Sequence, residues 1–368
     1  MLRSRDVSCH GRFSIAQARS LVQDLFTPSP WVYWTDLVCS LAIGMATFPL
    51  VRRLPGWFDW SPWAVALSGL AFGVSVCAFY RAALFTHELT HLRRGAVPGF
   101  SLAWNLLCGI PFMMPSFLYH THLVHHTRRH YGTAHDGEYL PLAHSPPRAI
   151  LWYLAQSLLI PILAVLRFLV LVPLAWLSPS LRRWVQQRAS SMVIDPSFVR
   201  PLPARRERRI WYLQEACCFL LLASTVVLVA LGRIPAGFVP QAYATAVVVV
   251  AINAVRTLGA HRYRVTGGEV DFVTQLVDSL NYPHRPWWNE LWAPVGLRFH
   301  ALHHLFPSLP YHNLARAHQR LMAHLPADSP YRRTEAASLN QSLRQLWSDA
   351  RAASHGHGLQ TPAGAGAR

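Results

Sequence analysis

Histidine is concentrated in three short stretches of this 368-residue chain. Sixteen of the 20 histidines lie between His87 and His318, and the stretches read HELTH at 87–91, HTHLVHH at 120–126 and HALHH at 300–304. A neutral imidazole presents a nitrogen lone pair near neutral pH, which makes histidine a common metal ligand. Clusters of this density therefore predict a metal centre.

The spacing within each cluster places its imidazoles on one side of a helix. Residues three and four apart share a helical face, so each cluster should aim its imidazoles at one point. The histidines concerned are His87 and His91, then His122, His125 and His126, then His300, His303 and His304. A tetrahedral zinc ion takes only four ligands, so this set favours two metal ions.

Apolar segments separate the clusters and must position them. Hydrophobic residues make up 52% of the chain and gather in long runs. This pattern predicts an all-α integral membrane protein with four transmembrane helices and a cytoplasmic, histidine-rich helical cap. The crossings are expected at 34–50, 63–85, 210–231 and 238–258, each close to the ~20 residues that span the hydrocarbon.

Two further apolar segments are not expected to be clean crossings. Segment 100–119 contains two prolines and should be shallow or re-entrant. Segment 150–177 is interrupted by Pro161, Arg167 and Pro173, and should form an interfacial helix pair or a shallow hairpin. Three domains follow: a cytoplasmic N-terminal lead-in at 1–30, the membrane domain at 31–325, and a disordered tail at 326–368, rich in Ala, Gly and Ser.

The net charge of +17 comes from arginine, because the sequence contains no lysine. Eight arginines lie between Arg182 and Arg209, as is typical of cytoplasmic segments beside membrane helices. We therefore expect both termini and all three clusters on the cytoplasmic side of a bacterial inner membrane. No basic stripe with interleaved aromatic residues lies outside the membrane flanks, so a nucleic-acid partner is not expected.

Together, the three clusters resemble the histidine boxes of the membrane fatty acid desaturase and hydroxylase superfamily. The resemblance rests on HELTH, HLVHH at 122–126 and HALHH in that order, on the membrane hairpin before the last of them, and on the continuation LFPSLPY at 305–311. It covers roughly residues 35–325. It implies two non-haem iron ions, O2 as co-substrate, and removal of hydrogen from an unactivated C–H bond.

The resemblance also implies a ligand set. In similar proteins a histidine soon after the last membrane helix completes the set, and His261 stands in that place. The implied metal ligands are His87, His91, His122, His125, His126, His261, His300, His303 and His304. His120 and His312 lie beside a cluster, and whether either binds metal stays open. No catalytic residue is expected beyond the metal ligands.

Five carboxylates near the clusters are candidates to orient the imidazoles, because metal-bound histidines usually donate their other N–H to a carboxylate or carbonyl. They are Glu88, Asp136, Glu138, Asp271 and Asp278. Asp136 and Glu138 could instead pair with the nearby Arg128 and Arg129.

Two other kinds of protein compete with this interpretation. HELTH matches HExxH, in which two histidines bind zinc and the glutamate acts as a general base. An intramembrane zinc protease would, however, leave both HxxHH clusters unexplained. A metal carrier would need polar groups deep within several crossings, and the predicted spans contain few.

The sequence thus predicts a membrane di-iron oxygenase acting on a long acyl or other lipid chain. Desaturation is the leading expectation, and hydroxylation of a fatty acyl or carotenoid-type lipid is the alternative. The two electrons must come from a separate donor of the ferredoxin or cytochrome type, because neither a haem-binding HPGG element nor a glycine-rich dinucleotide motif is present. The arginines of 182–209 could attract an acidic donor or only mark topology.

Overall fold

The computed structural model describes residues 13–357, and within this range the chain consists of α-helices, loops and short 3-10 or π turns, without a β-strand. The all-α class predicted from the sequence is therefore confirmed for the described residues. The long helices are α2 (Pro30–Trp57), α3 (Pro62–His91), α6 (Pro147–Leu166), α9 (Arg205–Ala230), α10 (Phe238–Ala260) and α15 (Leu339–His357). The shorter ones are α1 (Ile15–Val22), α4 (Phe100–Trp104), α5 (His122–His125), α7 (Val172–Leu177), α8 (Pro179–Arg188), α11 (Phe272–Asp278), α12 (Pro286–Trp292), α13 (His300–Leu305) and α14 (Leu314–His324).

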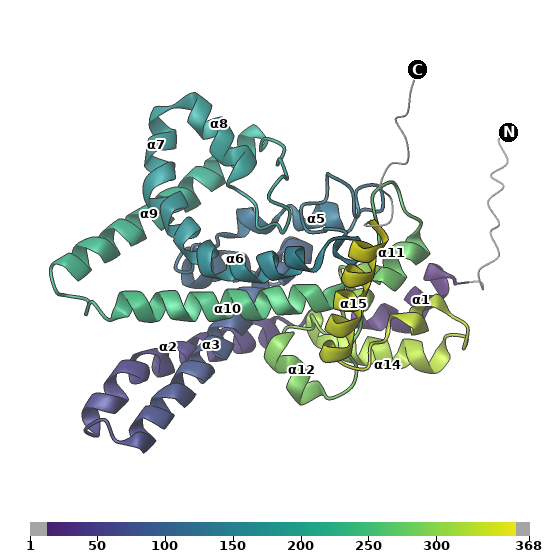
Figure 1. Ribbon diagram of the computed structural model, residues 1–368, viewed down its shortest axis with the longest axis horizontal. Helices are drawn as coiled ribbons and strands as arrows, with labels where there is room; N and C mark the ends of the chain where they lie inside the picture. The colour runs from purple at the N-terminus through teal and green to yellow at the C-terminus, as the bar shows by residue number, and fades with distance from the viewer. Residues whose placement is uncertain (1–12, 358–368) are drawn as a thin grey trace, which may run out of the picture.

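Among residues 13–357, five helices are long and apolar enough to cross a membrane. Four of them, α2, α3, α9 and α10, cover the predicted crossings. α2 and α3 form one hairpin, and α9 and α10 form a second. Figure 1 shows both hairpins extending away from the part of the molecule that carries α5. α2 and α3 each begin at a proline, which suits the first turn because no N–H is needed there.

The segment predicted to be an interfacial helix pair or shallow hairpin is instead one continuous helix, Pro147–Leu177, the fifth of the membrane-length helices in the described range. α6 passes through a π-helical turn, Arg167–Leu171, directly into α7. The expected division into two helices is therefore wrong, because Arg167 does not break the helix, whereas the expected interfacial position stays a prediction. The Arg167 side chain is buried and donates to Glu215 of α9 at 2.5 Å, so the helix continues through it.

The segment around Pro111 and Pro115 folds into short pieces. α4 leads into a π-helical turn, Asn105–Gly109, and together they form only ten residues of helix, too few for the ~20 that a crossing needs. The Asn105 amide links the two ends of the segment and joins them to α9. Its Oδ1 accepts from the Ser116 N–H at 2.9 Å and from Gln214 on α9 at 3.1 Å. The segment carries the chain from α3 to the second histidine cluster.

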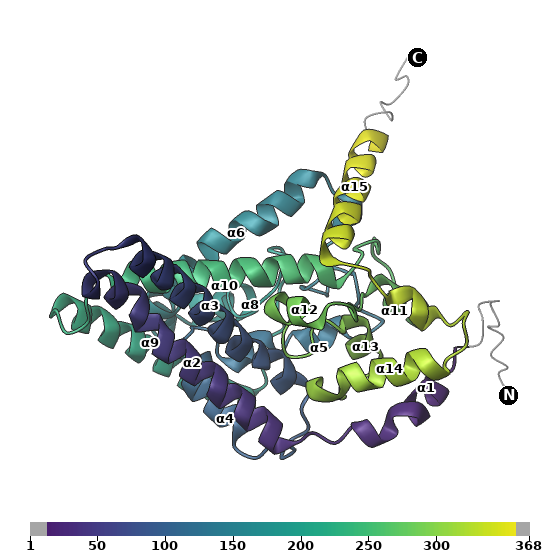
Figure 2. The same ribbon diagram turned by 90° about the horizontal axis from the view of Figure 1, so that it is seen from below.

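A cap of short helices packs on the ends of α2 and α3. It contains α11 to α14, with α1 lying beside α14 (Figure 2). Aromatic rings join the cap to the long helices: the Tyr311 ring lies 5.1 Å from that of Tyr33 on α2 and 5.6 Å from that of Phe85 on α3, both edge-on. This packing fixes the third histidine cluster, just before Tyr311, against the end of α3.

The tail predicted to be disordered from residue 326 onward contains α15, Leu339–His357. Leu346 and Ala350 are buried in the same hydrophobic cluster as Ile150 of α6. The prediction was wrong because it weighed the Ala and Ser content and overlooked apolar residues recurring at helical intervals. Residues 1–12 and 358–368 of the predicted lead-in and tail lie outside the described range.

Candidate metal centre

The structure brings all nine histidines of the implied ligand set together where α3 and α10 end. They form two groups, and within each group the candidate ligand atoms lie within 4.8 Å of one another. The first group is His87, His91, His122, His126 and His303, and the second is His125, His261, His300 and His304. Each group has enough nitrogen donors to hold one metal ion.

Both short histidine helices contribute to both groups. α5 directs His122 into the first group and His125 into the second. α13 directs His303 into the first group and His300 into the second. The expectation that each cluster aims at one point is therefore wrong for the second and third clusters. Side chains three residues apart are neighbours on a helix but point in slightly different directions, so one helical turn can supply two adjacent ions.

The first group has its imidazole Nε2 atoms turned inward. His126 Nε2 lies 2.9 Å from His122 Nε2 and 3.1 Å from His303 Nε2. The Nε2 atoms of His87 and His91 are buried and have no hydrogen-bond partner. Buried polar atoms are normally paired, so these orphaned nitrogens indicate a ligand.

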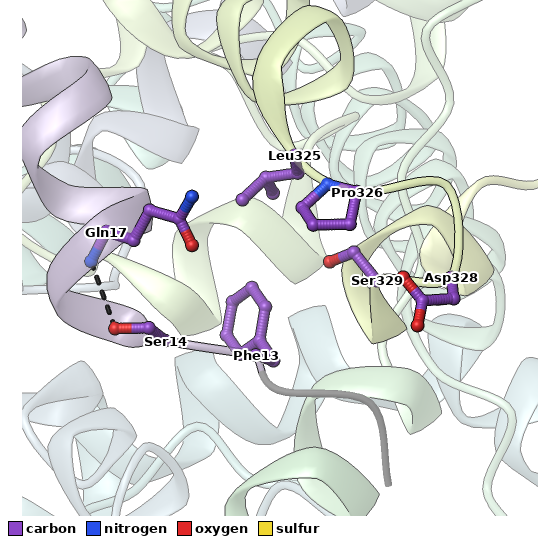
Figure 3. Close-up of a pocket in the computed structure, with 7 residues that line it drawn as sticks. All are labelled: Phe13, Ser14, Gln17, Leu325, Pro326, Asp328 and Ser329. Carbon is purple, nitrogen blue, oxygen red and sulfur yellow. Dashed lines mark hydrogen bonds between the residues drawn. The ribbon is translucent and has the colours of Figure 1, made fainter.

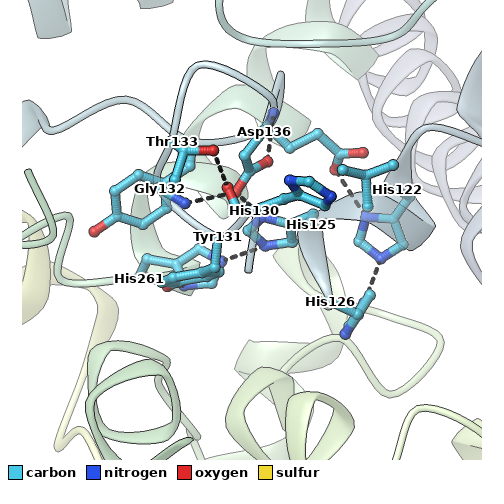
Figure 4. Close-up of polar contacts among 12 residues, drawn as sticks. His122, His125, His126, His130, Tyr131, Gly132, Thr133, Asp136 and His261 are labelled. Carbon is cyan, nitrogen blue, oxygen red and sulfur yellow. Dashed lines mark hydrogen bonds and ion pairs between the residues drawn. The ribbon is translucent and has the colours of Figure 1, made fainter. Parts of the chain in front are cut away.

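The second group converges on His261, which the chain presents directly after α10. His261 Nε2 lies 3.1 Å from His125 Nε2 and 2.9 Å from His300 Nε2. His304 Nε2 lies 3.1 Å from His300 Nε2. Figure 4 shows His125 approaching His261, and His122 separately approaching His126, in each case through the Nε2 atoms.

Two carboxylates hold the outer nitrogens of α5 histidines. His122 Nδ1 lies 2.8 Å from Glu138 Oε2, and His125 Nδ1 lies 2.8 Å from Asp136 Oδ2 (Figure 4). Asp136 is itself fixed, because it accepts from the Gly132 N–H at 3.0 Å. The expectation that these acids orient imidazoles fits this geometry. The alternative pairing with Arg128 and Arg129 does not occur, because the ion pairs of both carboxylates are with histidine.

Two hydroxyl groups approach His261 Nδ1, that of Ser279 at 3.2 Å and, more closely, that of Tyr131. The Tyr131 hydroxyl lies 2.9 Å from His261 Nδ1 and donates to Asp278 Oδ2 at 2.7 Å. Because this hydroxyl has one proton and gives it to Asp278, the hydroxyl oxygen accepts from His261 Nδ1–H. Tyr139 also donates to Asp278, at 2.9 Å, without a hydrogen bond to the imidazole. Asp278 therefore orients His261 indirectly.

The hydrogen bonds on Nδ1 show why a cation fits between the rings. His125 gives its Nδ1 proton to Asp136 and His261 gives its own to Tyr131, so each neutral ring has its lone pair on Nε2. These two lone pairs face each other at 3.1 Å and repel unless a positive ion lies between them. Nitrogens at right angles around an ion, each about 2.1 Å from it, would be about 3.0 Å apart.

Burial favours the neutral, metal-binding form of these imidazoles. Desolvation first, and neighbouring imidazoles second, hold the pKa of several histidines well below its usual value. They are His122, His126, His300, His303 and His304. Burial, then His125 and Arg256, lower the pKa of His261 likewise. For His125, burial lowers the pKa and the Asp136 carboxylate raises it. The net effect is a pKa of His125 above its usual value.

Two of the candidate orienting carboxylates do not serve the imidazoles. Glu88 accepts from the Tyr33 hydroxyl and from the Tyr311 N–H, and its nearest approach to His87 Nδ1 is 4.0 Å, too long for a hydrogen bond. Asp271 caps α11 by accepting from the Thr274 N–H at 2.7 Å. Both expectations were wrong because closeness in sequence does not fix the direction of a side chain.

His120 and His312 stay outside both groups. The His120 side chain is exposed, and His312 Nε2 accepts from the Ser29 N–H at 3.1 Å. Sequence reasoning missed Tyr131, because a lone tyrosine after the second cluster has no spacing that marks it. The role of Tyr131 becomes visible only in the three-dimensional structure, where His261 and Asp278 both reach its hydroxyl.

A separate pocket of about 300 Å3 lies between the start of α1 and the turn after α14 (Figure 3). Its lining residues are Phe13, Ser14, Gln17, Leu325, Pro326, Asp328 and Ser329. None of them belongs to either histidine group, so the pocket plays no part in the metal centre.

Comparison with known proteins gives the family of this chain. The family model for fatty acid desaturases matches residues 61–335, which include all nine histidines. The chain belongs to the fatty acid desaturase family and is an oxidoreductase of that membrane desaturase and hydroxylase class. It is 40% identical over 337 residues to a ceramide hydroxylase of Caulobacter vibrioides (strain NA1000 / CB15N), covering 90% of this chain and 92% of that protein. No solved structure matches the chain.

Proposed function

We propose that the protein is a membrane di-iron oxygenase that hydroxylates a ceramide-type lipid with O2 and two electrons from a separate donor. The observation that carries the proposal is the pair of facing imidazole groups at the ends of the membrane helices. The similarity to a ceramide hydroxylase favours hydroxylation over the desaturation that the sequence first suggested.

In the proposed enzyme each imidazole group holds one iron ion, and the bound pair supplies the activation of O2. Imidazole also suits zinc, copper and nickel, so the family relationship is what favours iron. The residues around the ligands fix their orientation: Glu138 holds His122, and Asp136 holds His125. The buried position of seven of the nine rings would limit the access of water to the bound metals.

The two candidate reactions differ in what the lipid gains or loses. In hydroxylation a C–H bond becomes C–OH, the second oxygen atom leaves as water, and two electrons and two protons complete the balance. In desaturation the same inputs remove two hydrogen atoms from neighbouring carbons, and both oxygen atoms leave as water. The mass of the product therefore distinguishes the two reactions.

The proposal includes a topology. α2 and α9 begin, and α3 and α10 end, at the histidine-bearing end of the molecule (Figure 1), so the two hairpins provide four crossings. Arginines at 205–209 flank the start of α9, as the positive-inside rule expects on the cytoplasmic side. We therefore assign the histidines and both chain ends to the cytoplasmic face of a bacterial inner membrane.

A zinc protease built on HELTH is disfavoured by the position of its glutamate. A general base must reach the water that it activates, whereas Glu88 is occupied by Tyr33 and Tyr311. The protease would also use one ion, and the structure offers two sets of ligands.

Lipid analysis tests the proposal directly. We would express the protein with a reduced ferredoxin system in a host supplied with ceramide, and analyse the lipids by mass spectrometry. We expect a ceramide that has gained one oxygen atom. A product that has lost two hydrogen atoms would establish desaturation, and unchanged ceramide beside an iron-loaded enzyme would contradict the proposed substrate.

A matched pair of variants ties the product to the metal centre. His303→Ala removes a candidate ligand of the first group, whereas His324→Ala changes a histidine of α14 outside both groups. We expect the first variant to lose iron and product, and the second to keep both. Full turnover in His303→Ala would contradict the ligand assignment.

A further inference from the structure

Four arginines at the edge of the first histidine group form an exposed basic patch, here called the arginine face. His91 is followed by Leu-Arg-Arg, and His126 by Thr-Arg-Arg. The patch consists of Arg93, Arg94, Arg128 and Arg129, all exposed. Within residues 13–357 their side chains form no hydrogen bond or ion pair, so their charges are available to a partner.

The two arginine pairs lie close together because the histidines before them do. The His91 and His126 rings are 4.7 Å apart between centroids. Arg93 and Arg128 follow two residues later, and two residues of chain extend at most about 7 Å. Two exposed arginines therefore follow each of two neighbouring ligands of the first group.

The arginine face is also where the metal centre comes nearest to solvent. His91 and His126 are the two of the nine candidate ligands with intermediate exposure, and the other seven are buried. A protein that docked on the arginine face would stand directly over the imidazoles of the first group.

We propose that the arginine face is the docking surface of the electron donor, a small acidic protein that carries one electron. The inference rests on the proposed function, because that reaction needs two electrons from outside. Each encounter would pass one electron to the metal pair and leave the carrier oxidised, so two encounters serve one turnover. Opposite charges around the exposed edge would steer the carrier to it.

The position of the arginine face argues against lipid headgroups as its partner. α3 has 30 residues, a length of about 45 Å, whereas the hydrocarbon is about 30 Å thick. The exposed Trp60 and Trp63 at the start of α3 mark the opposite interface. The last turns of α3 therefore extend beyond the hydrocarbon, and Arg93 and Arg94 lie further out still.

The other arginine-rich segment, 182–209, is less suited to docking. Arg182 is buried and donates to Glu215, and Arg200 is buried against backbone carbonyls. The exposed arginines at 205–209 lie at the start of a membrane-length helix, where lipid phosphates are near. This second patch provides a control of equal charge.

The test measures electron transfer without oxygen or lipid substrate. Iron-loaded protein in nanodiscs of neutral lipid is mixed anaerobically with a pre-reduced acidic [2Fe–2S] ferredoxin, and ferredoxin oxidation is followed by stopped-flow absorbance. One variant combines Arg93→Glu, Arg94→Glu, Arg128→Glu and Arg129→Glu; the control combines Arg183→Glu, Arg205→Glu, Arg206→Glu and Arg209→Glu. A third variant has Gln at the first four positions, in case charge reversal disturbs folding.

At low ionic strength we expect the Glu variant to react at least about 10-fold more slowly than the wild type, with the Gln variant between them. Iron content and reduction by dithionite should not change, and salt should slow the wild type toward the variant. The proposal would be overturned if the Glu variant reacted as fast as the wild type, or if the control variant were slowed as much as the Glu variant. A wild-type rate that did not depend on salt would overturn it as well.

Two further outcomes would show that the arginine face binds lipid headgroups or that the proposed function is wrong. If anionic lipid in the nanodisc, and not salt, governs the rate through these arginines, the face binds headgroups and the docking proposal fails. If the wild type holds no iron and oxidises no ferredoxin, the proposed function itself fails.

Discussion

Asp136 differs from the other acids of the metal centre because it binds an imidazole directly while two backbone N–H groups hold the carboxylate in place. Oδ2 faces His125 Nδ1 and accepts from Gly132, and Oδ1 accepts from the Glu138 N–H at 3.0 Å. A carboxylate fixed in this way determines which His125 nitrogen is free to bind metal.

Asp136→Asn should therefore weaken metal binding. The amide can no longer accept as a carboxylate does, and we expect iron affinity to fall about 10–100-fold. Iron titration of the purified apo-protein would measure the change. Asp271→Asn is the matched control, because asparagine also caps helices well and Asp271 contacts no imidazole; iron affinity lost equally in both variants would contradict the assignment.

Tyr131 and Tyr139 offer a second comparison at a single carboxylate. Both donate to Asp278, but Tyr131 also accepts from His261. Tyr131→Phe and Tyr139→Phe should each destabilise the fold by about 1–3 kcal/mol, the cost of a lost partner for a buried group. Only Tyr131→Phe should also reduce iron affinity, by about 10-fold or more. Thermal unfolding and iron titration of both variants would show whether the two effects separate.

Among single residues, the sequence predicted the histidines of the site but not all of the side chains that hold them. All nine residues chosen by spacing and resemblance converge in the structure, because helical periodicity constrains their direction. That they bind iron stays a prediction. Tyr131 could not be found, because its role depends on His261, 130 residues later in the chain.

Among the elements, the helix Pro147–Leu177 depends on one buried ion-pair network. Glu215 of α9 is fully buried and contacts Arg167 in the π turn and Arg182 on α8, both at 2.5 Å. These contacts tie three helices to one carboxylate and allow a charged residue to remain inside an apolar helix.

Removing that carboxylate should be costly. Glu215→Gln leaves two buried guanidinium groups without a counter-charge, and we expect a loss of about 3–5 kcal/mol in unfolding free energy. The comparison is Asp349→Asn, which breaks the more exposed pair with Arg264 and should cost less than about 1 kcal/mol. Denaturation in detergent would measure both, and similar midpoints for the two variants would show that the network contributes little.

Sequence reasoning placed the helices α2, α3, α9 and α10 correctly, because each contains a long apolar window. The continuity of the helix Pro147–Leu177 was not predicted, because the partner that neutralises Arg167 lies 48 residues away. The helix α15 was missed because composition was weighed above the spacing of its apolar residues, two of which pack on α6. Local patterns reveal an element, but distant contacts decide whether an interruption ends it.

For the whole molecule, topology can be tested at the ends of the helices. The chain after α8 returns to the second cluster, since the Met192 N–H donates to the Leu118 carbonyl at 2.9 Å and the Ile194 N–H donates to the Gly137 carbonyl at 2.8 Å. We therefore expect no net crossing between Pro147 and Arg205. In a cysteine-free background, single cysteines at Arg128 and Arg188 should be labelled from the same side, and one at Gly232 from the other. Labelling of Arg188 from the side of Gly232 would contradict four crossings.

Metal removal should affect the stability of the whole molecule. The candidate ligands come from α3, α5, α13 and the residue after α10, so bound metal would join these elements. Ferrous ion at 100 times its dissociation constant should stabilise the protein by about 2.7 kcal/mol for each of the two proposed sites, raising Tm relative to the chelated protein. Equal melting curves with and without iron would indicate that the histidines do not bind it. His303→Ala, which removes a candidate ligand of the first group only, should gain less Tm from iron than the wild type.

The distribution of ligands along the chain has a consequence for biosynthesis. More than two hundred residues separate His87 from His304, and a ribosome needs roughly 10–40 s to add that many at 5–20 residues per second. Helical segments as short as α5 and α13, with four and six residues, are not stable alone. On the proposed function, iron would therefore enter after translation is nearly complete, into a chain whose hairpins would already be in the bilayer. Cells starved of iron should accumulate this inserted apo-form, which would become active once iron is restored, without new protein synthesis.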